Sequence, residues 1–387
     1  MYDQTPPSGP VFQLSENQRA LQTRAREFAD TIARPQAAET DRTEVYPTAV
    51  VTALAEQGFM GMTVPAALGG PAHSYFDACL VVEEMAAACG VSGRIVVEGN
   101  MGAVGAIIAY GDEAQRQSAA EHVLSGDKPA ICITEPGAGS AATDMTTTAV
   151  RDGDGYVLNG SKMWISNAPF ADVFVVWAKS EAHDGKIRGF VLEKGMVGLS
   201  FGANERKMGW HSQPTAQVIM DDVRVPVANR IGEEGMGFKF AMSGLDGGRL
   251  NIAACSLGGA QLALDKALAY AKERKQFGKA IADFQATQFK LADMETELQA
   301  ARVMLFEAAR RLDAKSPDAT RWCAMAKRFV TDTGFKVAND ALQIHGGYGY
   351  LADYEVERIV RDLRVHQILE GTNEIMRVII SRDMLKD

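Results

Sequence analysis

An acidic residue that interrupts an apolar run is the clearest candidate for chemistry in this sequence. Glu370 lies in the segment Ile368-Leu-Glu-Gly-Thr372, directly before Asn373, where a helix could begin. Partial burial among apolar neighbours raises the pKa of a carboxyl group towards the range that suits a general base. A surface glutamate near a helix N-terminus would have the same local sequence, so both interpretations stay open on this segment alone.

A glycine-rich segment in the first half of the chain could approach a cofactor closely. It runs from Ile131 through Thr134 to Gly137, Gly139 and Ser140, and it superficially fits a dinucleotide-binding fingerprint. Thr-rich, strand-like sequence follows it instead of the helix whose N-terminus would bind a pyrophosphate, so we reject that interpretation. Its N–H groups and hydroxyls could still contact a flat heterocycle or a phosphate, although an ordinary turn is equally consistent with it.

A second glycine-rich segment follows a helical pattern near the C-terminus. It reads Gln343-Ile-His345-Gly346-Gly347-Tyr-Gly349. One glycine would suffice as a helix C-cap, whereas three in four positions favour close approach of a ligand to the backbone.

Two further groups could contact an aromatic or anionic ligand. Trp164 and Ser166 lie in one strand-like segment, where an indole can cover a flat cofactor beside a hydroxyl group, although a Trp in a sheet is more often core. Asp246 with Arg249, and Arg274 farther along, lie near helix ends, where arginines can bind phosphates. Exposed faces of long helices carry such residues too, so these groups indicate a site only in combination.

Composition sets the class of molecule that must position these residues. With 387 residues, of which 47% are hydrophobic, the chain suits two or three globular units. The net charge of −9 argues against nucleic acid or an anionic membrane as a partner, so an anionic ligand needs local basic groups. The longest apolar run, 95–110, is interrupted by Glu98 and Asn100, and we expect no membrane span.

Targeting and redox signals favour a cytoplasmic protein. The first ten residues are polar and Pro-rich, which is typical of a frayed tail rather than a signal peptide. Five scattered cysteines without a Cys-x-x-Cys pair indicate reduced thiols. The six histidines show no metal-ligand spacing, so we expect no metal.

The order of elements predicts a multidomain α+β protein. We expect an N-terminal α-helical domain (1–127), a central β-barrel or sandwich domain (128–235) and a C-terminal antiparallel four-helix bundle (236–387). The expected helices are 17–32, 48–56, 74–88, 113–124, 238–274, 284–314, 319–343 and 373–385, and the expected strands are 130–134, 156–159, 173–178, 189–192 and 217–220.

Five motifs in this order resemble the acyl-CoA dehydrogenase family over almost the whole chain, about residues 14–385. They are Thr134-Glu-Pro-x-x-Gly-Ser140, Trp164-Ile-Ser166, Arg274-Lys-x-Phe-Gly278, Gln343-x-x-Gly-Gly347 and Glu370-Gly-Thr372. The resemblance implies a helix–sheet–helix fold, FAD as cofactor and an acyl-CoA substrate. It also implies electron-transfer flavoprotein as the electron acceptor and a homotetramer arranged as a dimer of dimers.

The resemblance implies roles for residues at the matching positions. Glu370 is the base that removes the substrate α-proton, while a hydride leaves Cβ for the flavin. A minority of members place the base on the helix around 244–248, where this chain has no glutamate. The implied cofactor-binding residues are Ile131, Thr134, Gly139, Ser140, Trp164, Ser166, Arg274, Phe277, Phe284, Gln285, Gln343, His345, Gly346, Gly347, Thr372 and Glu374. The implied substrate-binding residues are Ser140, Arg94, Asp246, Arg249, Gly371 and Arg382.

Two positions depart from the family pattern. Ala141 stands where an aspartate is usual after the Gly-Ser pair, which could loosen the turn without removing FAD. His345 stands where several members carry a bulkier apolar residue. Arg274, Phe277, Gln285 and the Gln343–Gly347 loop match positions that contact FAD across a subunit interface in the family.

The two halves of the chain resemble different branches of the family. The C-terminal half is similar to isobutyryl-CoA dehydrogenases, which suggests a short or branched acyl group. The N-terminal half is similar to 3-sulfinopropionyl-CoA desulfinases, in which the arginine matching Arg94 engages the sulfinate and the base matching Glu370 is missing. Arg94 could therefore bind an anionic acyl tail. Alternatively, Glu98, four residues on, could pair with it on one helix face.

Three hypotheses follow. The first is a dehydrogenase of a short or branched acyl-CoA. The second is the same scaffold acting on a short acyl-CoA with a carboxylate or sulfinate tail, with possible C–C or C–S cleavage. The third is a flavin- and CoA-binding protein without oxidation activity, which the presence of Glu370 argues against.

Overall fold

The computed structural model describes residues 13–180, 186–232 and 245–386. The expected N-terminal tail and residues 236–244, where we expect the first C-terminal helix to begin, lie outside the described residues.

Seven α-helices form the N-terminal part of the described chain. They are α1 (Glu16–Phe28), α2 (Ala37–Thr43), α3 (Thr48–Glu56), α4 (Tyr75–Ala86), α5 (Gly90–Asn100), α6 (Ala103–Tyr110) and α7 (Glu113–Leu124). Side chains cap several of them: Ser74 accepts a hydrogen bond from the N–H of Asp77 at the start of α4, and Asp112 does the same for Gln115 at the start of α7. These caps fix the beginnings of helices that the sequence predicts closely.

Helices α5 and α6 are absent from the expected list because they are apolar nearly all round. Such helices show no amphipathic period and are buried on most sides. Together they form a stretch, Gly90–Tyr110, that by length and composition alone could cross a membrane. In the fold it is broken near Met101, and 78% of its apolar window is buried inside the protein.

The central part of the chain is an eight-stranded mixed sheet. Its strands are β1 (Ala130–Cys132), β2 (Thr148–Asp152), β3 (Gly155–Ser166), β4 (Val173–Ser180), β5 (Lys186–Glu193), β6 (Leu199–Phe201), β7 (Thr215–Pro226) and β8 (Arg230–Ile231). They are ordered β6-β7-β3-β2-β4-β5-β8, and β1 pairs in parallel with β4. The pairing of β3 with β7 shifts register between Lys162 and Ile165, which marks a bulge in β3.

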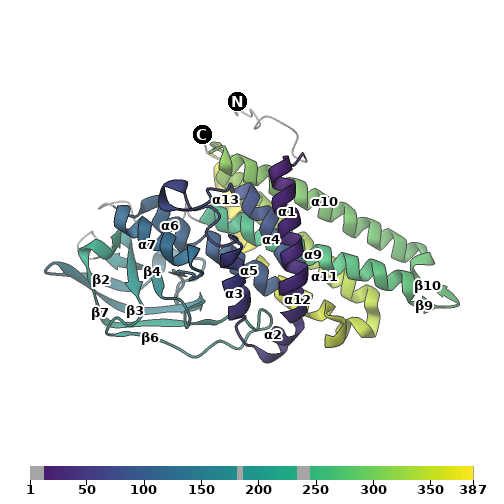
Figure 1. Ribbon diagram of the computed structural model, residues 1–387, viewed down its shortest axis with the longest axis horizontal. Helices are drawn as coiled ribbons and strands as arrows, with labels where there is room; N and C mark the ends of the chain where they lie inside the picture. The colour runs from purple at the N-terminus through teal and green to yellow at the C-terminus, as the bar shows by residue number, and fades with distance from the viewer. Residues whose placement is uncertain (1–12, 181–185, 233–244, 387) are drawn as a thin grey trace.

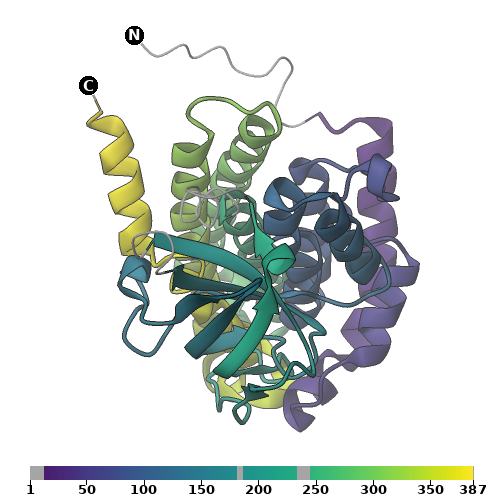
Figure 2. The same cartoon turned by 90° about the vertical axis from the view of Figure 1, so that its left-hand side faces the viewer.

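The C-terminal part is a set of long helices. It contains α9 (Leu245–Glu273), α10 (Gln285–Asp313), α11 (Ala319–His345), α12 (Val356–Arg364) and α13 (Asn373–Met384), with a short hairpin of β9 (Lys275–Gln276) and β10 (Lys279–Ala280) between α9 and α10. Helix α11 packs against α9, α10, α12 and α13. Figure 1 shows the sheet at one end of the molecule and the β9–β10 hairpin at the other, and in Figure 2 α13 stands at the edge of the molecule. The order of helices, sheet and helices confirms the expected fold class, with α12 as an addition to the four expected helices.

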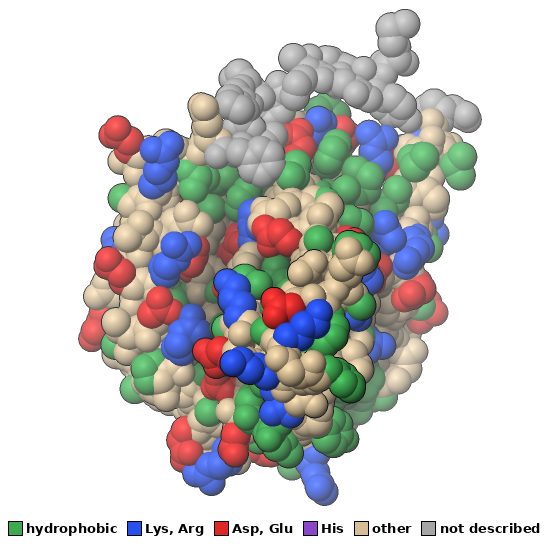
Figure 3. Space-filling model, turned by 90° about the vertical axis from the view of Figure 1, so that its right-hand side faces the viewer, with side chains coloured by type: hydrophobic (Ala, Val, Ile, Leu, Met, Phe, Trp, Pro, Cys, Tyr) green, Lys and Arg blue, Asp and Glu red, His purple; other side chains and the backbone are tan. Residues whose placement is uncertain are grey.

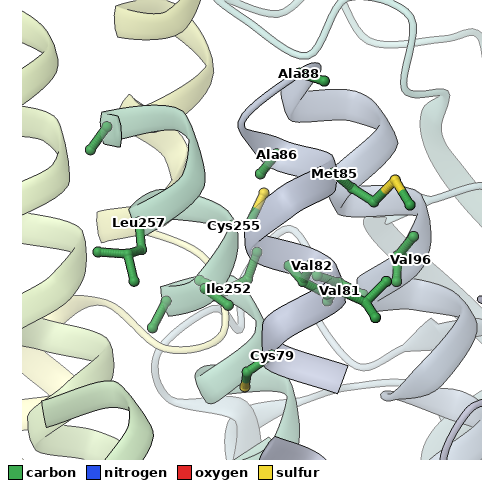
Figure 4. Close-up of a cluster of buried hydrophobic side chains, with 14 of the residues drawn as sticks. Cys79, Val81, Val82, Met85, Ala86, Ala88, Val96, Ile252, Cys255 and Leu257 are labelled. Atoms are coloured by element: carbon green, nitrogen blue, oxygen red, sulfur yellow. The ribbon is translucent and has the colours of Figure 1, made fainter. Parts of the chain in front are cut away.

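Small side chains let α4, α5 and α9 approach closely in the core. Figure 4 shows Cys79, Val82 and Ala86 of α4 beside Ile252 and Cys255 of α9. At Gly258 of α9 an added Cβ would lie 2.1 Å from the carbonyl oxygen of Glu83, so only glycine allows this contact. The tight contact holds α9 against the α4–α5 pair, which carries the first residues of the candidate site.

Candidate active site

The turn that carries Glu370 places its side chain inside the protein. Glu370 lies between a 3-10 turn (Val365–Gln367) and α13, and only 17% of its side chain is exposed. The hydroxyl of Thr372 accepts a hydrogen bond from the N–H of Ile375, which fixes the start of α13. Glu370 is therefore not the exposed glutamate that its local sequence leaves open.

The Glu370 carboxylate lies between α5 and α9. Its Oε1 is 3.7 Å from Nη1 of Arg94 on α5. On the other side, a Cβ added to Gly248 of α9 would lie 3.0 Å from Oε2. The missing side chain at Gly248 thus provides the space that the carboxylate occupies, in the same helical region where a minority of the resembling family carries its base.

Arg94 takes part in a buried charge network rather than a simple pair. Its Nε donates to Glu98 over 2.9 Å, which confirms the expected i,i+4 contact. Glu98 also accepts from Lys128 over 2.7 Å and from the Gln213 amide over 3.2 Å. Burial disfavours the charged form of Glu98, but Lys128 and Arg94 outweigh it and hold the pKa of Glu98 below its ordinary value. Two cations therefore share one buried carboxylate before Glu370 is counted.

Several buried polar nitrogens beside this network make no hydrogen bond within the described part of the chain. Nη1 of Arg94 and both ring nitrogens of His366 are buried and lack a hydrogen-bond partner among the described residues. The Arg94 guanidinium lies 5.4 Å from the Trp210 ring, whose centroid is 5.1 Å from that of His366. Burial, with the positive charges of Arg94 and Lys327, lowers the pKa of His366 to about 3, so its imidazole is neutral at pH 7. Buried unpartnered polar atoms of this kind are rare and often mark a site that a polar ligand or water completes.

Asp246 and Arg249, at the start of α9, face inward and pair with each other. Nη1 of Arg249 donates to Asp246 over 2.7 Å, and the Thr320 hydroxyl donates to the second Asp246 oxygen over 2.6 Å. Both side chains are buried. Nε of Arg249 lacks a hydrogen-bond partner within the described chain. Their role beside CoA stays a prediction.

The glycine-rich loop after β1 is anchored to the sheet by Glu135. Its carboxylate accepts from Lys162 over 2.8 Å and from the N–H groups of Thr146 and Thr147 over 2.5 and 3.0 Å. Burial alone would raise the pKa of Glu135, but the hydrogen bonds and the Lys162 charge lower it to about 2. The anchor fixes the loop that presents Thr134 beside β3.

Trp164 offers an open aromatic surface on the same sheet. It sits at the β3 bulge with φ of 58°, and 59% of its surface is exposed. Gly137 and Gly139 have no atom near a hypothetical Cβ, and Ser140 is exposed. An exposed indole next to open backbone and the hydroxyl residues Thr134 and Ser166 fits a flat ring system with a polar edge, as in FAD.

The other predicted cofactor residues lie around the β9–β10 hairpin. A cavity of about 370 Å³ is lined by Phe277, Ile281, Phe284, Gln343 and Ile344, and Phe277 is 95% exposed. Figure 3 shows this end of the molecule, where hydrophobic side chains lie among charged ones. His345 is turned inward: its Nδ1 lies 2.8 Å from the Ala341 carbonyl and its ring stacks on Tyr270 at 4.4 Å.

One chain does not bring all predicted cofactor residues together. Trp164 and the Thr134 loop belong to the sheet, whereas Phe277 and Gln343 lie at the opposite end of the long axis (Figure 1). The Glu374 side chain is 80% exposed at the start of α13, and Arg382 is exposed in its last turn. Only Glu370, Gly371, Arg94 and the Asp246–Arg249 pair gather around the start of α9.

The structure adds residues to the site that we did not select from the sequence. They are Lys128, Trp210, Gln213, Lys327 and His366. Lys327 had a signal that could have identified it, because it occupies the apolar stripe of α11 with Ala324, Val330 and Thr331. Lys128 and Gln213 lie between predicted elements, where no periodic pattern indicates burial.

Three family models match consecutive parts of the chain. They describe the acyl-CoA dehydrogenase N-terminal domain (residues 15–127), middle domain (130–223) and C-terminal domain (235–385).

Curated relatives are similar over nearly the full length. A mitochondrial isobutyryl-CoA dehydrogenase of Dictyostelium discoideum is 47% identical, covering 98% of this chain and 91% of that protein. A 3-sulfinopropanoyl-CoA desulfinase of Paraburkholderia xenovorans is 45% identical, covering 97% of each. A subunit of the caffeyl-CoA reductase–Etf complex of Acetobacterium woodii is 41% identical, covering 96% of this chain and 99% of that protein.

Solved structures share the fold. Butyryl-CoA dehydrogenase from Megasphaera elsdenii has a TM-score of 0.94 at 36% identity and covers 97% of this chain and 100% of that one. A glutaryl-CoA dehydrogenase from Mycobacterium smegmatis, solved in complex with FADH2, has a TM-score of 0.91 at 27% identity and covers 96% of this chain and 95% of that one.

Proposed function

The chain belongs to the acyl-CoA dehydrogenase family of FAD-dependent oxidoreductases, and we propose that it dehydrogenates a short or branched-chain acyl-CoA with Glu370 as the base. The observation that carries the proposal is the placement of the Glu370 carboxylate in the space left by Gly248, next to Arg94 and away from bulk solvent. An isobutyryl-like acyl group is the proposed substrate because of the similarity to isobutyryl-CoA dehydrogenases.

Proton removal from a thioester needs both a base and stabilisation of the enolate. The α-proton is weakly acidic, so charge that develops on the thioester oxygen must be stabilised. In the proposed reaction an Oε atom of Glu370 takes the α-proton, and the Glu370 backbone N–H donates to the thioester oxygen. The inward position of the turn excludes water from this proton transfer.

FAD supplies the acceptor for the β-hydrogen when it is bound. On the sheet, Trp164, Ser166, Thr134 and Ser140 are the residues that would hold it. The hairpin group, with Phe277, Phe284 and Gln343, would contact it from a second copy of the chain, because these residues lie at the far end of the molecule.

The test is anaerobic bleaching of the bound flavin by isobutyryl-, butyryl-, glutaryl- and 3-sulfinopropionyl-CoA. We expect complete bleaching by at least one of the neutral short-chain substrates. Absence of bleaching with all four thioesters, in protein shown to contain FAD, would refute the dehydrogenase proposal.

A second candidate function is favoured by Nη1 of Arg94 and the ring nitrogens of His366, which lack hydrogen-bond partners among the described residues. Arg94 shares Glu98 with Lys128, and the carboxylate that faces Nη1 of Arg94, that of Glu370, lies 3.7 Å away, beyond hydrogen-bond distance. A carboxylate or sulfinate at the end of a short acyl chain would have the charge to bind there. Such a substrate could also lose its tail by C–C or C–S cleavage, which links this candidate to the desulfinase relatives.

Comparison of Arg94→Gln with the parent protein separates the two candidates. If an anionic tail binds Arg94, the variant loses its rate on glutaryl- and 3-sulfinopropionyl-CoA at least about tenfold more than on butyryl-CoA, the scale of a lost charge-assisted hydrogen bond. Equal losses on charged and neutral substrates would contradict anion binding. Lys336→Met on the exposed face of α11 serves as a matched loss of positive charge.

We also propose partners beyond the substrate. Electron-transfer flavoprotein is the proposed acceptor, in line with the similarity to a subunit of an Etf complex. A homotetramer, arranged as a dimer of dimers, would bring the hairpin of one copy to the sheet of another. A cytoplasmic location is consistent with five buried cysteines that form no disulfide.

A further inference from the structure

The backbone that carries Glu370 is held in an unfavourable conformation. Glu370 has φ of 56° and Gly371 has φ of 90°, so two consecutive residues lie in the left-handed region. A glutamate pays a steric cost there that glycine does not, and such a conformation persists only where surrounding contacts enforce it. The contacts that hold this turn therefore also decide where the Glu370 carboxylate and N–H point.

Lys327 of α11 contacts this turn directly. Its Nζ donates to the Gly371 carbonyl over 2.7 Å and to Oδ1 of Asn373 over 2.9 Å. The Asn373 amide in turn donates to Asp332 over 2.7 Å and to the Thr331 hydroxyl over 3.0 Å. The Lys327 ammonium group thus binds on both sides of Thr372, and Asn373 makes two further hydrogen bonds to the same helix.

The surroundings of Lys327 are unusual for a lysine. The residue is fully buried in the apolar stripe of α11, and a buried cation is unfavourable unless its hydrogen bonds are satisfied. Burial lowers the pKa of Lys327 to about 8, although Glu370 acts in the opposite direction. A methionine of similar length would fill the same space without this cost, so packing alone does not account for a lysine here.

We propose that Lys327 is the positioning residue of the base: its two hydrogen bonds set the Glu370–Gly371 turn so that the carboxylate reaches the substrate α-carbon and the N–H reaches the thioester oxygen. This inference rests on the proposed role of Glu370. Lys327 itself is not placed in contact with the substrate.

The proposal predicts a pH dependence that depends on several charged groups. Glu370 on the turn, Asp332 on α11 and Glu374 on α13 favour the charged ammonium, whereas Arg249 on α9 opposes it. His366, whose pKa the Lys327 charge helps to lower, is neutral. Loss of the Lys327 proton above about pH 8 removes the charge-assisted character of both hydrogen bonds, and proton abstraction should slow. An arginine stays charged throughout this range.

The test compares five variants of the FAD-containing protein with the parent, and the fifth is Glu370→Gln. Lys327→Met removes the donor, Lys327→Arg retains the charge, and Asn373→Ala removes the second attachment of the turn. Lys336→Met is the control, because Lys336 lies on the same helix, is 53% exposed and pairs only with Glu297 in the described contacts. Three quantities are measured: the dissociation constant of butyryl-CoA, exchange of its α-protons with D2O, and flavin reduction between pH 6.5 and 9.5.

For Lys327→Met we expect nearly unchanged butyryl-CoA affinity and a loss of roughly 100-fold in both exchange and reduction, the scale of a misplaced catalytic group. Its rate should also lose the decline above pH 8. Lys327→Arg should recover most of the rate and move the decline to higher pH. Asn373→Ala should show a smaller loss of the same kind, and Lys336→Met none.

Parent-like exchange and reduction in Lys327→Met would overturn the proposal. If that variant does not fold, Lys327→Arg decides: an unshifted pH profile relative to the parent overturns it. Glu370→Gln distinguishes this failure from that of the proposed function. Normal exchange in Glu370→Gln refutes the base itself, whereas slow exchange there with normal exchange in Lys327→Met refutes only the role of Lys327.

Discussion

The two ends of α9 are built in opposite ways. The helix has 29 residues, about 43 Å at 1.5 Å per residue, and it joins the Glu370 site to the β9–β10 hairpin. At its first turns Gly248 and Arg249 are buried, and Arg249 donates a hydrogen bond to the buried Asp246. Beyond its last turn Phe277 is almost wholly exposed beside an open cavity.

This difference indicates which steps a single chain can perform and which need a second copy of the chain. Glu370, proposed as the base, lies in the turn before α13, and its neighbours Arg94 and Lys327 come from α5 and α11 of the same chain. The groups proposed for the cofactor are split between the sheet and the distant hairpin. Proton transfer should therefore depend on single-chain geometry, and cofactor retention on association.

The largest effect should come from the base. Glu370→Gln keeps the shape of the side chain but cannot accept the α-proton, so flavin reduction by a substrate should slow at least about 100-fold while acyl-CoA still binds. Stopped-flow reduction and a separate binding titration measure the two quantities. A near-normal rate of flavin reduction would show that Glu370 is not the base.

The second-largest effect should come from a substitution at Gly248, beside the Glu370 carboxylate. In Gly248→Ala the new Cβ would lie 3.0 Å from the Glu370 carboxylate, which would have to shift by a few tenths of an ångström. We expect a loss of roughly tenfold or more in flavin reduction with unchanged FAD content, because small misplacements of catalytic groups are costly. Gly105→Ala, which meets no atom within 4 Å, is the matched control. Equal rates in the two variants would show that the carboxylate is not confined by α9.

At the hairpin end we expect a substitution to affect assembly and FAD retention rather than proton transfer. Phe277→Asp should weaken self-association and FAD retention, because a charge would replace an exposed aromatic side chain beside the cavity. Light scattering and the flavin-to-protein ratio measure both. Ile281 lines the same cavity, so Ile281→Val, a milder apolar change, serves as the control. If the Phe277→Asp protein still assembles and retains FAD, the hairpin end is not needed for association or for cofactor retention.

The smallest effect concerns the sheet anchor, which belongs to neither end. The folded-state pKa of Glu135 is lowered to about 2, so between its ordinary pKa near 4.5 and pH 2 the unfolded chain binds more protons than the folded one. Glu135 therefore contributes stability that is present above pH 4.5 and is lost as the pH falls towards 2. Thermal melts should show a shallower decline over this acidic window in Glu135→Gln than in the parent. An identical acid profile would mean that the Lys162 pair does not tune stability.

Local sequence signals predict much of this fold. The bounds of α3 and α7 match the expected ranges, and the Asp112 cap explains the sharp start of α7. The pattern fails at α5, where burial on nearly all sides leaves no period. Helix α12 is also absent from the expected helices, although it is as long as α3. Strands β3 and β7 extend well beyond their expected cores because their partners, not their composition, set their length.

In the candidate site, too, local patterns predict some residues and miss those that depend on long-range contacts. Glu370 is recognisable because an acidic residue stands among apolar ones, and Arg94 because it lies four residues before Glu98. Lys128, Gln213 and Lys327 owe their importance to contacts with residues 30 to 115 positions away, which no local pattern encodes. The separation of the two cofactor groups is likewise a property of the folded chain alone.

The environment of Glu98 has a consequence for how this protein can change over evolutionary time. Its partners come from α5, from the segment that enters the sheet, and from the loop before β7. Recombination that exchanged the middle segment between relatives would keep Arg94 and Glu98 but bring in foreign neighbours for both. Where the incoming segment lacked a cation at the position of Lys128, the Glu98 carboxylate would lose one of its two cationic partners, so we expect these segments to be inherited together.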